Sequence, residues 1–141
     1  MVLMLPTDHP VNGPVTQVMA DLMKKLGLNV DAQAMDAGTM FERRASRAPV
    51  EKGGWSAFPS AVGGVDVLSP IVSFLPRGNG LNGWYGWPTS PKTEALRAAW
   101  FEARTLADQQ RAAAQLQVQV LADASYAPLG QVLQPPPTAR R

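Results

Sequence analysis

Apolar residues near the start of the chain follow two different periods. Val2 to Leu5 form a short apolar run that Pro6 ends, a pattern typical of a buried strand. Farther along, apolar residues recur at helical spacing, which predicts a helix that packs through one face and ends at Gly27. The residues of this face are Val15, Val18, Met19, Leu22, Met23 and Leu26.

The period then changes to that of a strand. Leu28 to Ala34 alternate between apolar and polar residues, so we expect a strand with one buried face. A strand, a helix and a second strand at this spacing predict a parallel pair joined by a right-handed crossover. Asp36 or Thr39 is placed to cap a second helix that ends before Pro49, and Trp55 to Phe58 predict another strand.

Turns give way to helices in the second half of the chain. We expect a helical turn between Val67 and Phe74, among many turn residues. Ser90 followed by Pro91 is typical of a helix start, because the hydroxyl caps the helix and proline suits its first turn. We place Trp100 in the core, as part of an apolar stripe made of Leu96, Ala99, Trp100 and Ala103.

A second long helix is predicted directly afterwards. Asp108 is placed to cap it, and it extends over residues 109–124. Leu116 to Val120 also alternate like a strand, but the alanine run and the unbroken length favour a helix. Tyr126 to Leu133 lie between a serine and a run of prolines, which predicts a closing strand.

These elements predict the α/β fold class, a mixed β-sheet with flanking helices. The two helices of residues 91–124 are expected to pack on the same sheet as the first helix. With 141 residues and a hydrophobic content of 45%, the chain is long enough for one modest core. We therefore expect residues 1–134 to form a single α/β lobe and residues 135–141 a proline-rich, basic tail.

Composition excludes several kinds of chemistry. The absence of cysteine rules out disulfides, thiolate catalysis and cysteine metal ligands. The net charge is only +2, and the one basic cluster, Arg43, Arg44 and Arg47, is interpreted as a solvated helix face, so no nucleic-acid partner is expected. His9 is the sole histidine and is interpreted as a surface residue of a proline-rich loop. We expect no metal, no cofactor and no enzyme activity.

The chain is organised around a segment rich in glycine and tryptophan, residues 53–88. It holds eight of the twelve glycines and three of the four tryptophans. Glycine allows close backbone approach, and Trp and Tyr offer flat apolar area with a polar handle, so this mixture is typical of a recognition surface. A long loop whose indoles only cover the core is the alternative interpretation.

The order of these motifs resembles the C-terminal part of the solute-binding proteins of bacterial peptide-type ABC importers, extracellular solute-binding family 5. The helix-strand-helix passage of that family resembles TQVMADLMKKLGLNVDAQAMDAGTMFERRAS, and its central strand and turn resemble GGWSAFPSAVGGVDVLSP. Its paired late helices resemble GWPTSPKTEALRAAWFEA and the Ala/Gln-rich segment that follows. Its strand returning toward the hinge resembles YAPLGQVLQP.

The resemblance implies one lobe of a periplasmic binding protein type II-like fold, with this chain as a C-terminal domain fragment that holds most of the second lobe. It implies a protein located in the periplasm, which captures peptides or similar small organic solutes and delivers them to a membrane permease. The implied partners are the solute, the ABC permease subunits and the N-terminal lobe of the same protein. The implied assembly state is a monomer.

The resemblance also implies a ligand-facing segment. In that family an acidic residue shortly before the turn matching Gly64 to Asp66 often anchors the amine of a bound peptide. Ala61 occupies the nearest matching position, a departure that argues against an ordinary peptide ligand. Asp66 matches a turn residue, and we expect it to cap the next helical turn. The expected ligand-binding residues are Phe58, Ser60, Ala61, Trp84, Tyr85 and Trp87.

A function of a different class remains open. The chain would then be a small standalone interaction module that holds a protein or a glycan through Trp84, Tyr85 and Trp87. In either case we expect at least one of these three rings to be exposed, because a surface built for a partner is uncovered when it is alone.

Overall fold

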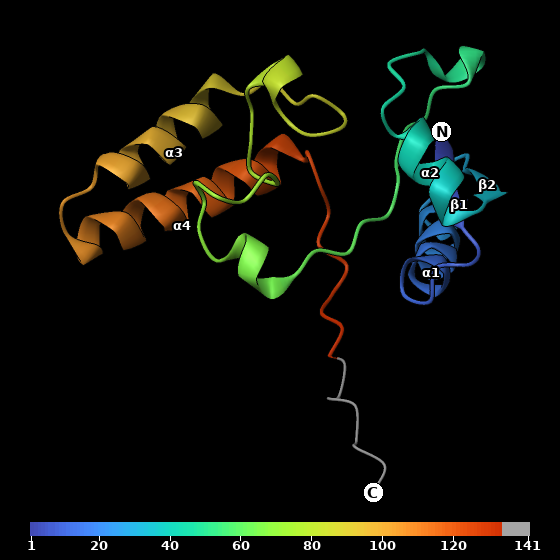
Figure 1. The fold of residues 1–141 in the computed structure, drawn as a ribbon, viewed down its shortest axis with the longest axis horizontal. Coiled ribbons are helices and arrows are strands. Elements are labelled where there is room, and N and C mark those ends of the chain that lie inside the picture. The colour runs from blue at the N-terminus through green and yellow to red at the C-terminus, as the bar shows by residue number, and fades with distance from the viewer. Residues whose placement is uncertain (134–141) are drawn as a thin grey trace, which may run out of the picture. The chain divides into compact units, whose positions relative to one another are not determined.

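The computed structural model describes residues 1–133 and divides the chain into two compact units (Figure 1). The first unit holds Met1–Ser60 and the segment that starts at Pro128, and the second holds Ala61–Ala127. The single lobe expected for residues 1–134 stays a prediction. The expected tail, residues 135–141, lies outside the described residues.

The first unit is built on a two-stranded parallel sheet. Strand β1, Val2–Pro6, pairs with strand β2, Asp31–Met35, and the helix α1, Asn12–Lys25, connects them. Val2 lies opposite Asp31 in the register. The predicted strand-helix-strand unit with parallel pairing is therefore confirmed, although β2 begins after the first residues of the predicted range.

Local contacts explain where α1 begins and ends. The ring Nδ1 of His9 accepts hydrogen bonds from the backbone N–H groups of Val11, at 3.3 Å, and Asn12, at 3.1 Å, so His9 caps the helix start. At the other end Gly27 has φ +86°, and its N–H donates to the carbonyl of Lys24 at 2.9 Å. His9 thus has a structural role that its surface interpretation did not include.

The face that α1 turns to the sheet differs from the predicted one. The buried residues of the helix are Asn12, Gly13, Thr16 and Ala20, whereas Val18, Leu22 and Leu26 of the predicted stripe are exposed. Small side chains let the helix approach the strand closely. A Cβ on Gly13 would lie 2.7 Å from the carbonyl oxygen of Pro6. The core beneath the helix contains Leu3, Ala20 and Val30.

A second, shorter helix completes the unit. Helix α2, Ala37–Arg43, is capped by Asp36, whose carboxylate accepts from the N–H of Thr39 at 2.9 Å. Asp36 is therefore the cap, and Thr39 lies inside the first turn. Met40 of α2 is fully buried, as is Met4 of β1.

The strand predicted over Trp55 to Phe58 is reduced to a single parallel β-bridge. Ala57 pairs with Leu3, and the N–H groups of Ser56 and Ala57 both donate to the carbonyl of Val2, at 2.9 and 3.1 Å. Pro59 follows directly and has no N–H for the ladder, which limits the pairing to this one point.

Two antiparallel helices dominate the second unit. Helix α3, Pro91–Glu102, and helix α4, Leu106–Asp123, lie side by side in Figure 1. Burial of Ala112, Leu116 and Val120 follows helical spacing, which confirms the helix over the alternative strand. Whether these helices pack on the sheet stays a prediction.

Some details of the second unit correct the sequence analysis. Thr105, not Asp108, is the cap of α4, because its hydroxyl oxygen accepts from the N–H of Asp108 at 3.1 Å. Trp100 is half-buried rather than in the core. The helical turn predicted between Val67 and Phe74 is confirmed, because the N–H of Ser73 donates to the carbonyl of Ser69 at 2.9 Å. The short 3₁₀ helix Gly64–Val67 precedes it, and Asp66 lies inside this 3₁₀ helix instead of capping the next turn.

The closing strand predicted for Tyr126 to Leu133 is wrong. These residues are exposed and have no regular secondary structure. Gly130 has φ +147°, which interrupts a regular strand of L-residues, and among residues 1–133 the only sheet is the pair β1–β2. Within the same range, none of the helices combines the length and apolar character required to cross a bilayer.

Candidate functional site

The six expected ligand-binding residues belong to both units. Phe58 and Ser60 lie in the first unit, and the second unit begins at Ala61 and contains Trp84, Tyr85 and Trp87. Ser60 and Ala61 are exposed, and the four aromatic residues are half-buried. Trp84, Tyr85 and Trp87 thus lie in one unit, close together along the chain, whereas Phe58 and Ser60 lie in the other.

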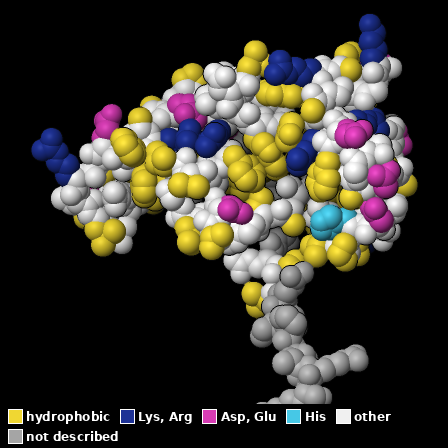
Figure 2. All heavy atoms as spheres, viewed as in Figure 1, with side chains coloured by type: hydrophobic (Ala, Val, Ile, Leu, Met, Phe, Trp, Pro, Cys, Tyr) yellow, Lys and Arg dark blue, Asp and Glu magenta, His cyan; other side chains and the backbone are white. Residues whose placement is uncertain are grey.

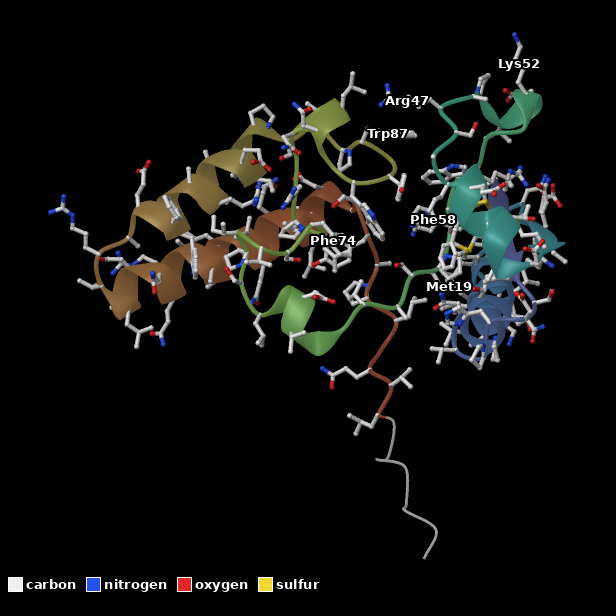
Figure 3. All side chains as sticks on the ribbon, viewed as in Figure 1. Met19, Arg47, Lys52, Phe58, Phe74 and Trp87 are labelled. Carbon is white, nitrogen blue, oxygen red and sulfur yellow. The ribbon has the colours of Figure 1, made fainter. Side chains whose placement is uncertain are left out.

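In the first unit the rings of Trp55 and Phe58 form an edge-to-face pair. Their centroids are 4.9 Å apart and their planes meet at 88°, an arrangement that aromatic quadrupoles favour. Trp55 is half-buried, as is Phe58, which Figure 3 labels. The pair gives this end of the glycine- and tryptophan-rich segment a fixed apolar anchor.

Arg43 holds the backbone beside this pair. Its guanidinium donates to the carbonyls of Gly53 and Gly54, at 2.9 and 2.8 Å, and to the side-chain oxygen of Gln33 at 2.7 Å. A Cβ on Gly54 would lie 2.0 Å from the carbonyl oxygen of Ala48, so only glycine fits. Arg43 is thus a structural clamp, and its interpretation as part of a solvated helix face is wrong.

In the second unit the aromatic residues lie on a closed loop, residues 78–90, which we call the aromatic loop. Its ends are joined by backbone hydrogen bonds from Ser90 N–H to the Gly78 carbonyl, at 2.8 Å, and from Gly80 N–H to the Pro88 carbonyl, at 2.9 Å. A Cβ on Gly78 would lie 2.8 Å from the backbone oxygen of Ser90. The close approach of the two ends therefore requires glycine at position 78.

The tip of the aromatic loop is a tight turn with unusual backbone angles. Trp87 N–H donates to the carbonyl of Trp84 at 2.9 Å, and Gly86 between them has φ +94°, as a type II turn requires. Trp87 itself has φ +49°, a left-handed conformation that costs a non-glycine residue about 1–2 kcal/mol. Such strain persists where surrounding contacts enforce it, and it is frequent at ligand sites.

Ring contacts order the side chains of the loop. Trp84 lies 4.4 Å from Phe74 and 5.8 Å from Tyr85, measured between ring centroids. Trp87, labelled in Figure 3, follows on the same turn. Trp84, Tyr85 and Trp87 are all half-buried, so the expectation of an exposed aromatic residue among them is wrong, and none of them is fully buried either.

Helix α3 anchors the aromatic loop through two charged side chains. The carboxylate of Glu94 accepts from the Gly78 N–H at 2.7 Å and from Arg97 at 2.6 Å. Arg97 also donates to the carbonyls of Pro70, at 3.0 Å, and Ile71, at 3.4 Å. One ion pair thus binds both the start of the loop and the segment that precedes it.

The electrostatics of this pair favour the charged carboxylate. Burial raises the pKa of Glu94, but the hydrogen bonds from Arg97 and the Gly78 N–H and the charges of Arg97 and Arg77 outweigh it. They hold the pKa below its ordinary value of 4.5. The side chain of Arg97 is only 11% exposed, so this ion pair is better shielded from water than a typical surface pair.

A hydroxyl network joins the start of α3 to the end of α4. The Ser90 hydroxyl oxygen caps α3 by accepting from the Thr93 N–H at 3.3 Å. The buried hydroxyl of Thr93 donates to the carboxylate of Asp123 at 2.7 Å. Hydrogen bonds from the hydroxyls of Ser90 and Thr93 lower the pKa of Asp123. The helix that carries the Glu94–Arg97 pair is therefore itself fixed at its first turn.

Two shallow hollows lie on the helices of the second unit, and neither is lined by the expected ligand-binding residues. A hollow of about 310 Å³ is lined by Ile71, Glu94, Arg97, Ala98 and Phe101. A groove of about 510 Å³ between α3 and α4 is lined by Lys92, Leu96, Ala114, Gln115, Val118 and Gln119. Figure 2 shows how many apolar side chains reach the visible surface.

The described part of the chain contains no cluster of three or more side chains suited to hold a metal ion. The Nδ1 atom of His9 is engaged by backbone N–H groups. The aromatic loop offers flat apolar area and backbone polar groups instead. These are means of binding an organic molecule.

The anchoring residues Arg43, Glu94 and Arg97 were missed by the sequence analysis. Glu94 and Arg97 are three positions apart at the start of a predicted helix, a spacing at which opposite charges meet. This spacing could have predicted the ion pair from the sequence. The contacts of Glu94 to Gly78 and of Arg97 to Pro70 could not be predicted, because they depend on how a distant loop returns to the helix.

Comparison with known proteins gives one informative match. No protein-family model matches the chain. It is 30% identical, over 135 residues and 96% of its length, to the protein of Sinorhizobium fredii (strain NBRC 101917 / NGR234) described as probable peptide ABC transporter periplasmic-binding protein y4tO. The aligned residues make up only 25% of that relative, so the chain spans a quarter of its length.

Proposed function

We propose that this chain is part of a solute-binding protein of a bacterial ABC importer. In this proposal the protein captures peptides or similar small organic solutes in the periplasm, delivers them to a membrane permease and is not an enzyme. The observation that carries the proposal is the alignment, along 96% of the chain, with a relative described as a periplasmic-binding protein for peptides.

The structure is compatible with this proposal, in which the chain supplies only one part of the solute-binding site. Proteins that close around a solute hold it between two lobes, and the chain spans only a quarter of its relative's length. We therefore assign to this chain one wall of the binding cleft, within a type II-like lobe, and assign the opposite wall to an N-terminal lobe. The α/β unit around β1 and β2 is compatible with that assignment.

The aromatic loop is the proposed solute-binding surface of this wall. Trp84, Tyr85 and Trp87 would contact apolar parts of the solute, since indole and phenol rings bury large apolar areas and keep a polar edge. Phe58 and Ser60 stay expected solute contacts of the first unit by itself. Ala61 provides no negative charge that could pair with the amine of a solute. The favoured solutes therefore either have no free amine beside Ala61 or have that amine bound by another residue.

Titration calorimetry on the full-length protein that contains this chain tests the proposal. Short peptides and small organic solutes are titrated into the parent protein, into Trp87→Ala and into Phe101→Ala. Trp87→Ala should weaken binding at least about tenfold, which corresponds to 1.4 kcal/mol. Phe101→Ala removes a ring that is 70% exposed on α3 of the same unit and should leave the affinity unchanged.

Two results would contradict the proposal. One is the absence of binding by any peptide or small organic solute, and the other is an equal loss of affinity in both variants. The first would show that the protein is not a receptor for these solutes, and the second that the aromatic loop is not the contact surface.

A standalone interaction module is the second candidate function. It is favoured by one observation: the aromatic loop and its anchors Glu94 and Arg97 all lie within the one compact unit Ala61–Ala127. Binding of the 141-residue chain alone to a glycan or protein array, abolished by Trp87→Ala, would support this candidate. Binding only by the longer protein would exclude it.

A further inference from the structure

Most asparagines of the chain are followed directly by glycine. Asn29 precedes valine, and the other pairs are Asn12–Gly13, Asn79–Gly80 and Asn82–Gly83. Glycine has no side chain to shield its backbone nitrogen and leaves the chain free to rotate. That nitrogen can therefore attack the side-chain carbonyl carbon of the asparagine before it, and the fold decides at which pair this happens.

The reaction is an intramolecular cyclisation that releases ammonia. The glycine nitrogen bonds to the side-chain carbonyl carbon of the asparagine, and the bond from that carbon to the amide nitrogen breaks. The amide nitrogen leaves as ammonia with the proton of the glycine N–H. Water then opens the cyclic succinimide at either carbonyl, which yields aspartate or isoaspartate, whose backbone is lengthened by a methylene. The attack requires a glycine N–H that is released from its hydrogen bond and a backbone that can rotate.

Helix α1 holds the first of these pairs firmly. Asn12 is buried at the first residue of the helix, and the Gly13 N–H donates to the carbonyl of His9 at 3.0 Å. The hydroxyl of Thr16 donates to the carbonyl of Asn12 at 2.6 Å. The Gly13 nitrogen is therefore released only when the first turn of α1 unfolds.

The closure of the aromatic loop holds the second pair. Asn79 forms an antiparallel bridge with Thr89, and the N–H of Gly80 donates across the loop to the carbonyl of Pro88 at 2.9 Å. A further backbone bond closes the loop beside this pair, and a carboxylate of α3 fixes the start of the loop. Release of the Gly80 nitrogen therefore requires the two ends of the loop to separate.

The third pair is held by contacts within one short turn. Asn82 is the last residue of the 3₁₀ helix Gly80–Asn82, and its N–H donates to the carbonyl of Asn79 at 3.3 Å. The N–H of Gly83 donates to the carbonyl of Gly80 at 2.7 Å. Neither bond crosses the loop, and a single 3₁₀ turn has poorer hydrogen-bond geometry than an α-helix. The Gly83 nitrogen is therefore released by the smallest local opening of the three.

We propose that Asn82 is a site of spontaneous deamidation and that its isoaspartate product loosens the aromatic loop. The turn leaves no room for a longer backbone, because a Cβ on Gly83 would lie 3.0 Å from the carbonyl oxygen of Gly80 and 3.1 Å from Oδ1 of Asn79. Isoaspartate lengthens the chain directly before Gly83 and breaks its bond to Gly80. Trp84, the next residue, then loses its fixed position. This chemistry does not depend on which molecule the loop binds.

Peptide mapping by mass spectrometry tests the site in the full-length protein that contains this chain. The protein is incubated at mildly alkaline pH with and without denaturant, and fragmentation of the peptides assigns each deamidated residue. In the folded protein Asn82 should react at least about tenfold faster than Asn79 and Asn12, because its glycine nitrogen is released by a smaller opening. In denaturant the three rates should converge, since each asparagine precedes glycine.

Tryptophan fluorescence tests the consequence for the aromatic loop. In Asn82→Gln the side chain is one methylene longer and would have to form a larger ring, which slows the reaction. Asn79→Gln is the matched control in the same loop. After incubation the parent protein and Asn79→Gln should show red-shifted tryptophan emission, whereas Asn82→Gln should keep its initial spectrum.

Three results would overturn the proposal. The first is a rate at Asn82 in the folded protein that equals or falls below the rate at Asn79. The second is no reaction at Asn82 over a time in which the denatured protein reacts completely. The third is conversion of Asn82 to isoaspartate with unchanged tryptophan emission, because it would show that the turn accepts a longer backbone.

Discussion

At the scale of single residues, the glycine- and tryptophan-rich segment is held by arginine side chains. Arg43 donates to the carbonyls of Gly53 and Gly54, and Arg97 donates to those of Pro70 and Ile71. Loop carbonyls lack the ladder partners of a helix or sheet, and each one that is left unsatisfied when buried costs free energy. The planar, five-donor guanidinium satisfies two of them at once.

Replacing Arg97 with lysine should loosen the aromatic loop. A lysine ammonium cannot reproduce the directional contacts of Arg97 to Glu94, Pro70 and Ile71, so the free energy of unfolding should fall by about 1–3 kcal/mol. Chemical denaturation measures this, and near-ultraviolet circular dichroism should show weaker tryptophan signals. The control is Arg111→Lys. Its pair with Asp108 has the same three-residue spacing but is exposed, so stability should change by less than about 1 kcal/mol.

Acid should weaken the same anchor. The pKa of Glu94 is lower in the folded chain than its ordinary value of 4.5, so its contribution to stability is complete above pH 4.5. It is lost as the pH falls from there through the folded pKa. The free-energy difference between the parent chain and Glu94→Gln should therefore shrink on acidification from pH 7 to about pH 3.

Denaturant titrations at several pH values measure that difference. Glu102→Gln, which alters an exposed carboxylate of the same helix, controls for the general effect of charge removal and should change stability little. A difference between the parent chain and Glu94→Gln that stays constant over the whole pH range would show that the Glu94 carboxylate does not stabilise the loop.

At the scale of secondary-structure elements, the sequence predicts which helices and strands form better than it predicts which face of each element is buried. The pair of parallel strands and helices α1, α3 and α4 follow from apolar spacing and capping residues such as Ser90. The buried face of α1 does not, because apolar spacing favours the side that contains Leu22, whereas the side that meets the sheet contains Thr16 and Ala20, whose small side chains allow close approach. The failed strand at Tyr126 to Leu133 has a related cause, since pairing depends on a partner edge that local sequence does not specify.

The closure of the aromatic loop depends on a single glycine. In Gly78→Ala the new Cβ would lie 2.8 Å from the backbone oxygen of Ser90, too close for any side chain rearrangement to relieve. We expect a loss of about 1–3 kcal/mol of stability and red-shifted tryptophan fluorescence as the rings become more exposed. Gly64→Ala is the matched control, because nothing lies within 4 Å of its Cβ. Equal effects of the two substitutions would show that loop closure is not the cause.

At the scale of the whole molecule, the expected ligand-binding residues belong to two compact units, and the chain matches a quarter of its relative. Phe58 and Ser60 belong to one unit and the aromatic loop to the other. Sequence analysis predicted these residue types from composition and from a family resemblance. Their common role in binding stays a prediction, because the opposite wall of the cleft is itself part of the proposal.

The most direct test of the two-lobed receptor compares affinities. The same solutes are titrated calorimetrically into the 141-residue chain and into the full-length protein. A site with one wall loses most of its contacts with the solute, and a loss of about 4 kcal/mol weakens binding roughly a thousandfold. The account predicts tight binding by the full-length protein and no useful affinity for the shorter chain. Comparable affinity in both would contradict it.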